Sequence, residues 1–128
     1  MNEKSRYWLE SAQYDYETAK VMLSGGRFLY VGFMCHLTME KVLKAVIVNT
    51  QEDNPPKIHD LVKLAKQGGV YDDMSEAQKD FLELLLPLNI EARYPSYKSS
   101  LAAALNQERC KMILDETEAL VQWLETKL

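Results

Sequence analysis

The feature that most constrains the fold of this chain is the apolar segment at residues 28–48, which reads FLYVGFMCHLTMEKVLKAVIV. A helix with apolar side chains on nearly every face belongs at the centre of a domain, where charged groups are costly unless they are paired. His36, Glu40 and Lys44 nevertheless interrupt the segment at steps of four, with Lys41 beside them. Since residues four apart share one helix face, they form a polar stripe. This stripe is either a set of structural pairs or the wall of a site.

Helical periodicity also precedes and follows this central segment. Residues 3–23 predict a first helix that ends at Gly25-Gly26. Its buried face carries Trp8, Ala12, Asp15, Ala19 and Met22. The carboxyl group of Asp15 in the middle of that face is a second polar anomaly. A short helix is expected from His59 to about Gln67, after a polar loop at residues 50–57.

The C-terminal half predicts two more helices. Ser75 and Gln78 form a capping-box pattern at the start of one of them, and we expect Pro87 to kink or interrupt it. The last helix runs from an N-cap at Asn106 to the C-terminus, after a connection at 96–105 that has no clear pattern. Because no segment carries a clear strand signal, we expect an all-α fold, an antiparallel four- or five-helix bundle.

Length and composition bound the class of protein. A chain of 128 residues suits a single domain over 1–128, and 47% hydrophobic with 27% charged residues suits a folded one. The net charge of −4 opposes general polyanion binding, so a nucleic-acid contact needs a local basic patch. The two cysteines, Cys35 and Cys110, are too few for a disulfide framework. The first residues, MNEKSRYW, lack the apolar stretch of a signal peptide. The charged residues within 28–48 argue against a membrane span. We therefore expect a cytoplasmic protein.

The sequence carries none of the short motifs that announce common chemistries. It has no Gly-rich phosphate loop, zinc-ligand spacing, CxxC pair or nucleophile elbow. Its two histidines are too few for a metal site by themselves, so we expect neither a metal nor a cofactor. The polar candidates that remain are Asp15, His36, Glu40, Lys41, Lys44, His59, Asp60, Arg93 and Tyr94.

The candidates within helices each have a structural interpretation as well. Glu40 and Lys44 are an i,i+4 pair in the favoured order, so they either neutralise one another or face a ligand. Asp15 needs a cation, since burial drives an unpaired carboxylate toward its protonated form. Lys41, Lys44 or Arg93 would provide this cation. His36 is more typical of a hydrogen-bonded core histidine than of a catalyst.

The candidates near helix ends are better placed for binding. At the start of a short helix, His59 would lie where free N–H groups and the helix dipole favour an anion and a neutral imidazole, whereas the dipole alone explains Asp60. Arg93-Tyr94-Pro95 closes a helix. A guanidinium at a rigid turn suits a phosphate or carboxylate, although it would equally pair with Asp15 or Glu40.

Five short segments, taken in order, resemble the HEPN domain, the higher eukaryotes and prokaryotes nucleotide-binding domain. They are Trp8, Ala12, Asp15 and Ala19 in the early helix; Arg27-Phe28 after the glycines; Glu40-Lys41-x-x-Lys44-Ala45; Ile58-His59-Asp60-Leu61; and Glu91-Ala92-Arg93-Tyr94-Pro95. The resemblance covers nearly the whole chain. It rests on the order and the gaps of these motifs, since each one is short.

The resemblance implies a helical bundle that usually forms homodimers and is often encoded beside a minimal nucleotidyltransferase, as a toxin–antitoxin pair. Many members of the family are metal-independent ribonucleases in which an Arg is followed after four to six residues by a His. Arg93 is the candidate for that arginine, but Lys98, Ser99 and Ser100 stand where the histidine is expected. The usual general acid/base of RNA cleavage is therefore missing.

Three hypotheses follow from these residues and from the resemblance. The preferred one is an accessory HEPN module that associates with a nucleotidyltransferase and binds a nucleotide or another anion. Its pocket would be lined by Arg93, Tyr94, Lys44 and His59, with Asp15, His36, Glu40 and Lys41 as supporting polar residues. The second is a ribonuclease toxin with a divergent active site, in which Arg93 holds the phosphate of an RNA and His59 or Tyr97 transfers protons. The third is a non-catalytic dimerising scaffold.

Overall fold

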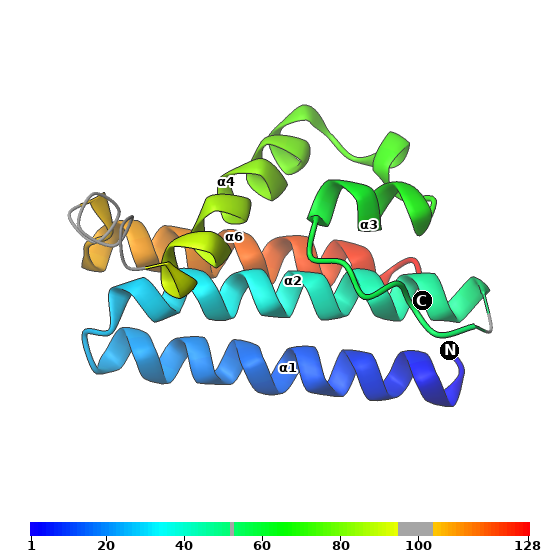
Figure 1. The fold of residues 1–128 in the computed structure, drawn as a ribbon, viewed down its shortest axis with the longest axis horizontal. Helices are drawn as coiled ribbons and strands as arrows, with labels where there is room; N and C mark the ends of the chain where they lie inside the picture. Colours follow the sequence, from blue (N-terminus) through cyan, green and yellow to red (C-terminus); the bar gives the residue numbers. More distant parts are fainter. Residues whose placement is uncertain (52, 95–103) are drawn as a thin grey trace.

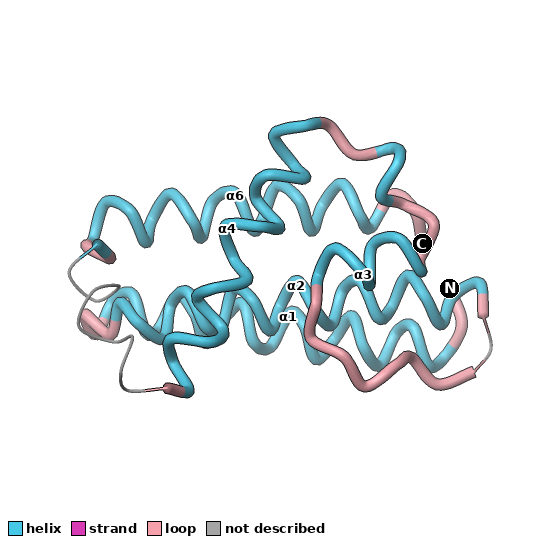
Figure 2. Tube along the Cα trace, turned by 45° about the horizontal axis from the view of Figure 1, so that its top comes forward, coloured by secondary structure: helices cyan, strands magenta, loops and turns pink. Residues whose placement is uncertain are grey.

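The apolar segment forms α2 (Phe28–Thr50), the helix around which the others pack in the computed structural model of the chain (Figure 1). The structure describes residues 1–51, 53–94 and 104–128. The other long helices are α1 (Glu3–Ser24), α4 (Glu76–Arg93) and α6 (Gln107–Glu125), and the short helix α3 (Leu61–Gln67) and the 3-10 turn η1 (Tyr71–Asp73) lie between α2 and α4. Figure 2 shows helices and loops, without a strand, in this described part of the chain, which confirms the expected all-α bundle.

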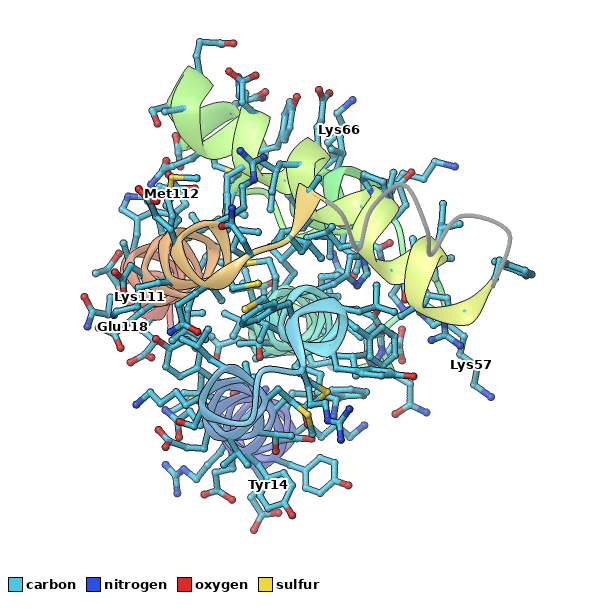
Figure 3. The ribbon with its side chains drawn as sticks, turned by 90° about the vertical axis from the view of Figure 1, so that its left-hand side faces the viewer. Tyr14, Lys57, Lys66, Lys111, Met112 and Glu118 are labelled. Carbon is cyan, nitrogen blue, oxygen red and sulfur yellow. The ribbon has the colours of Figure 1, made fainter. Side chains whose placement is uncertain are left out.

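The long helices alternate in direction along the chain. Helices α1 and α2 form an antiparallel pair, α6 runs along α2, and α4 crosses them obliquely (Figure 1). Seen nearly along the axes in Figure 3, α2 lies near the middle, with contacts to α1, α3, α4 and α6. Both termini lie at the same end of the bundle. The polar stripe of α2 is therefore surrounded by protein.

Side-chain caps fix the starts of several helices, although α2 has none. The capping box at Ser75 and Gln78 is present, with both reciprocal hydrogen bonds formed. Asn106 is the expected N-cap of α6, since its side chain accepts from the backbone N–H of Arg109 at 2.8 Å. Asn2 caps α1 in the same way and also donates to the carbonyl of Val48, which ties the start of α1 to the end of α2.

The expected start of α3 was wrong, and the expected interruption of α4 at Pro87 is absent, whereas the alternative of a kink at Pro87 stays a prediction. Helix α3 starts at Leu61 and not at His59, because Asp60 is its N-cap and accepts from the backbone N–H groups of Val62 and Lys63 at 3.0 and 3.1 Å. Helix α4 also continues through Pro87 without interruption. Proline removes only one hydrogen bond, and the buried apolar side chains in the neighbouring turns hold the helix against the core. The connection expected at 96–105 lies mostly outside the described residues.

One close approach positions the C-terminal half of α4. Gly32 of α2 is so near Leu88 of α4 that a Cβ atom at residue 32 would lie 2.9 Å from Cδ1 and 3.2 Å from Cβ of Leu88. Glycine thus lets the two helices approach at the level where α4 ends in Arg93. No helix in the described ranges is long and apolar enough to cross a membrane.

Candidate functional site

Glu40 lies at the centre of a polar cluster on α2. The residue is 5% exposed, and its two carboxylate oxygens have different partners. Oε2 accepts from Nζ of Lys44 at 3.1 Å, and Oε1 lies 3.0 Å from Nδ1 of His59. The first contact is the expected i,i+4 pair. The second joins residues that are 19 positions apart and was not expected from the sequence.

Lys44 is held inside this cluster. The residue is 6% exposed, and its ammonium group lies 5.5 Å from the centre of the Trp8 ring as well as against Glu40. Aromatic faces attract cations, so Trp8 and Glu40 together compensate for the burial of the charge. The structure therefore places Lys44 behind Glu40, as part of the support of the site.

His36 is fully buried beside Glu40. Its Nδ1 lies 3.8 Å from Oε1 of Glu40, and neither ring nitrogen has a hydrogen-bond partner among the described residues. His36 is thus the expected core histidine, but the hydrogen bond expected for it is not formed there. Burial is the main reason that the pKa of His36 is lowered to about 4, with Glu40 opposing the shift. The charges of His59 and Arg93 lower this pKa further, so both groups act on the same buried imidazole.

His59 is the part of the cluster that reaches solvent. Its side chain is 58% exposed while Nδ1 faces Glu40. The adjacent N-cap, Asp60, fixes the backbone at this point. The Glu40 carboxylate accepts a hydrogen bond from Nδ1–H, which assigns the tautomer in which Nε2 of the neutral ring is an acceptor. His59 is therefore oriented like a general base or a ligand contact.

Arg93, the last residue of α4, is oriented by two residues that the sequence analysis missed. Its Nε donates to Oδ1 of Asn89 at 3.2 Å, and its Cζ lies 5.3 Å from the centre of the Phe33 ring. In the described part of the chain, the terminal guanidinium nitrogens have no hydrogen bond or ion pair. Asn89 stands four residues before Arg93, and this spacing, which puts both on one helix face, was the signal in the sequence.

The remaining candidates divide between this cluster and a separate pair. Tyr94 is the C-cap of α4 and is 58% exposed next to Arg93, whereas Tyr97 falls outside the described residues. Asp15 pairs with Lys41, whose Nζ lies 2.7 Å from Oδ2 of Asp15 and 2.8 Å from Oγ of Ser11. The lysine that neutralises Asp15 is thus Lys41. This pair fastens α1 to α2 and is distinct from the cluster at Glu40.

Two groups that both act on the buried imidazole of His36 offer the chemistry of an anion site. Arg93 and His59 provide a directed guanidinium and an exposed imidazole, and Glu40 with Lys44 holds the imidazole from behind. No group of three or more His, Cys, Asp or Glu side chains that would hold a metal ion is found within residues 1–51, 53–94 and 104–128.

The comparisons with known proteins agree with the helical architecture. The crystal structure of TT1696 from Thermus thermophilus has a similar fold, with a TM-score of 0.85 at 20% identity, over 99% of this chain and 100% of that chain. None of the curated proteins compared matches the sequence. The family model of the HEPN domain matches residues 5–127, nearly the whole chain. The protein therefore belongs to the HEPN-domain family.

Proposed function

We propose that this protein is an accessory HEPN module that binds a nucleotide or another phosphate-bearing anion through Arg93, Tyr94 and His59. Lys44 supports this site as the buried ion-pair partner of Glu40. The observation that carries the proposal is the orientation of Arg93. The Phe33 ring and Asn89 hold the guanidinium, and its terminal nitrogens have no partner among the described residues. A planar donor pair held in this way recognises phosphate oxygens and loses little conformational entropy on binding.

His59 and Tyr94 add contacts that suit the other parts of a nucleotide. The exposed imidazole of His59 provides a hydrogen-bonding group whose orientation is fixed by Glu40. The exposed ring of Tyr94 provides a face against which a base stacks. The net charge of −4 gives no long-range attraction for anions, so binding depends on these local groups.

Thermal unfolding with ATP tests the anion site. A ligand that binds only the native state at ten times its Kd stabilises the protein by about 1.4 kcal/mol, which raises Tm by several degrees. Arg93→Ala should abolish the shift and Arg93→Lys should reduce it, because lysine cannot donate a parallel pair of hydrogen bonds. The control is Arg6→Ala, an exposed arginine on α1. An unchanged Tm at millimolar ATP, GTP and inorganic phosphate would refute the proposal.

A second candidate function, a metal-independent ribonuclease, is favoured by the contact between Glu40 and His59. The carboxylate fixes the imidazole so that Nε2 is available to take a proton from a 2′-hydroxyl group, and Arg93 would stabilise the phosphate in the transition state. His59 would thereby replace the absent family histidine. RNA cleavage that is lost in both His59→Ala and Arg93→Ala would establish this alternative over the accessory module.

The module is proposed to act with protein partners. As in many family members, these would be a second copy of the chain and a minimal nucleotidyltransferase in a toxin–antitoxin-like pair. Light scattering should then give a mass near twice 14.8 kDa. A nucleotidyltransferase encoded by the neighbouring reading frame should copurify when the two are co-expressed. A protein that dimerises but binds neither nucleotide nor RNA would instead fit the non-catalytic scaffold.

A further inference from the structure

The outer face of α1 carries the most exposed large apolar side chains in the described part of the chain. Tyr7, Tyr14 and Val21 are 69%, 76% and 66% exposed, and they are spaced seven residues apart. Seven residues are about two helical turns, so the three side chains form one stripe about 21 Å long. Figure 3 shows Tyr14 pointing from α1 away from the rest of the bundle.

A row of carboxylates borders one side of this stripe, and Lys4, Ser11 and Thr18 lie along the other side. Glu3, Glu10 and Glu17 are also seven residues apart, each lies three or four positions from a member of the stripe, and all three are exposed. Glu17 forms an exposed ion pair with Lys20 at 3.1 Å. We define the α1 face as Tyr7, Tyr14 and Val21 with Glu3, Glu10 and Glu17. An apolar stripe with an acidic border matches a helix that has an apolar stripe of its own and basic residues beside it.

We propose that the α1 face docks an amphipathic helix of another protein, with lysine or arginine residues flanking its apolar stripe. A second copy of this chain fits the face poorly when the two α1 helices pair antiparallel. In an antiparallel two-fold pairing the stripes would meet, but the glutamate rows of both copies would lie on the same side and repel. The net charge of −4 adds to that repulsion and favours a basic partner. The α1 face is independent of the proposed anion site, because none of its residues belongs to the Glu40 cluster.

A pair of synthetic peptides tests the docking surface on the whole protein. Both are amphipathic helices of about six turns with leucines at the a and d positions, one with lysines and the other with glutamates at e and g. The lysine peptide should bind at least roughly tenfold more tightly, and its affinity should fall with added salt. The amide NMR signals that shift on binding should map to α1 around Tyr7, Tyr14 and Val21.

Two variants decide whether the α1 face carries this binding. The double substitution Tyr7→Ser and Tyr14→Ser should weaken lysine-peptide binding at least roughly tenfold, with unchanged helix content by circular dichroism because both side chains are exposed. Met112→Ser, which alters an exposed apolar side chain on α6, should bind as the wild type does. Equal binding of the two peptides, or NMR shifts outside α1, would overturn the proposal. So would a homodimer that Tyr14→Glu dissociates, because the occupant would then be a second copy.

Discussion

Nδ1 of His59 lies 3.0 Å from Oε1 of Glu40, so an exposed imidazole is fastened to a buried carboxylate. The same carboxylate neutralises Lys44 through its other oxygen. One side chain thus stabilises the core and orients a group at the surface. Substitutions can separate these two roles. Removing the carboxylate of Glu40 affects both the core and the orientation of His59, whereas removing His59 affects only the group at the surface.

Glu40→Gln should destabilise the protein by about 3 kcal/mol, because it leaves the buried ammonium of Lys44 without a counter-ion. Urea unfolding measures the change. The double variant Glu40→Gln with Lys44→Met should recover part of the loss, since no buried charge remains. His59→Asn should change the free energy of unfolding by less than about 1 kcal/mol, as its side chain is largely exposed. Equal stability of Glu40→Gln and wild type would contradict the buried pair.

His36 should make the protein less stable in mild acid. Its pKa is lowered to about 4 in the folded protein, mainly by burial, from 6.5 when unfolded. Above pH 6.5 the imidazole is neutral in both states. Between pH 6.5 and 4 only the unfolded state takes up the proton, so the free energy of unfolding falls by up to about 3 kcal/mol.

The substitution His36→Leu isolates this effect. Between about pH 7 and about pH 5, the free energy of unfolding should fall by about 2 kcal/mol less in the variant than in the wild type. Any acid sensitivity that comes from other groups should stay the same in both proteins. Urea titrations of both proteins at the two pH values give the difference. Parallel pH profiles of wild type and variant would show that His36 is charged in the folded state as readily as in the unfolded one.

Gly32→Val should destabilise the α2–α4 contact by about 1–2 kcal/mol, because the added atoms would collide with Leu88. The shift of α4 should also weaken the proposed anion site, since Arg93 ends that helix. Thermal unfolding with and without ATP measures both effects. Combining Gly32→Val with Leu88→Ala should cost less than the sum of the single changes, as the smaller side chain makes room.

Asp15→Asn should lower the free energy of unfolding by about 1–2 kcal/mol without changing anion affinity. The substitution removes the carboxylate that Lys41 contacts at 2.7 Å, while the Glu40 cluster keeps all its contacts. Lys41→Met should have a similar or smaller effect, since the lysine is 24% exposed at its side chain. A loss of ATP binding in Asp15→Asn would place this pair in the site.

Much of the architecture was predictable because it is encoded locally. The apolar segment around Glu40 identified the central helix, and the capping residues Ser75 and Asn106 marked two helix starts correctly. The i,i+4 spacing also predicted the contact between Glu40 and Lys44. Helical periodicity and short-range hydrogen bonds depend on neighbours in sequence, so such features can be read without the fold.

Which helix faces meet was decided only by the tertiary structure. The sequence placed Lys41, Lys44 and Arg93 as equal partners for Asp15, and packing of α1 on α2 selected Lys41. It gave no sign that His59 would reach Glu40, because the turn before α3 brings together residues 19 positions apart. These pairings depend on loop paths and helix crossings, which residue spacing does not specify. The sequence by itself determined the helices and the buried polar stripe, and the packing of α1, α3 and α4 on α2 decided what each polar group does.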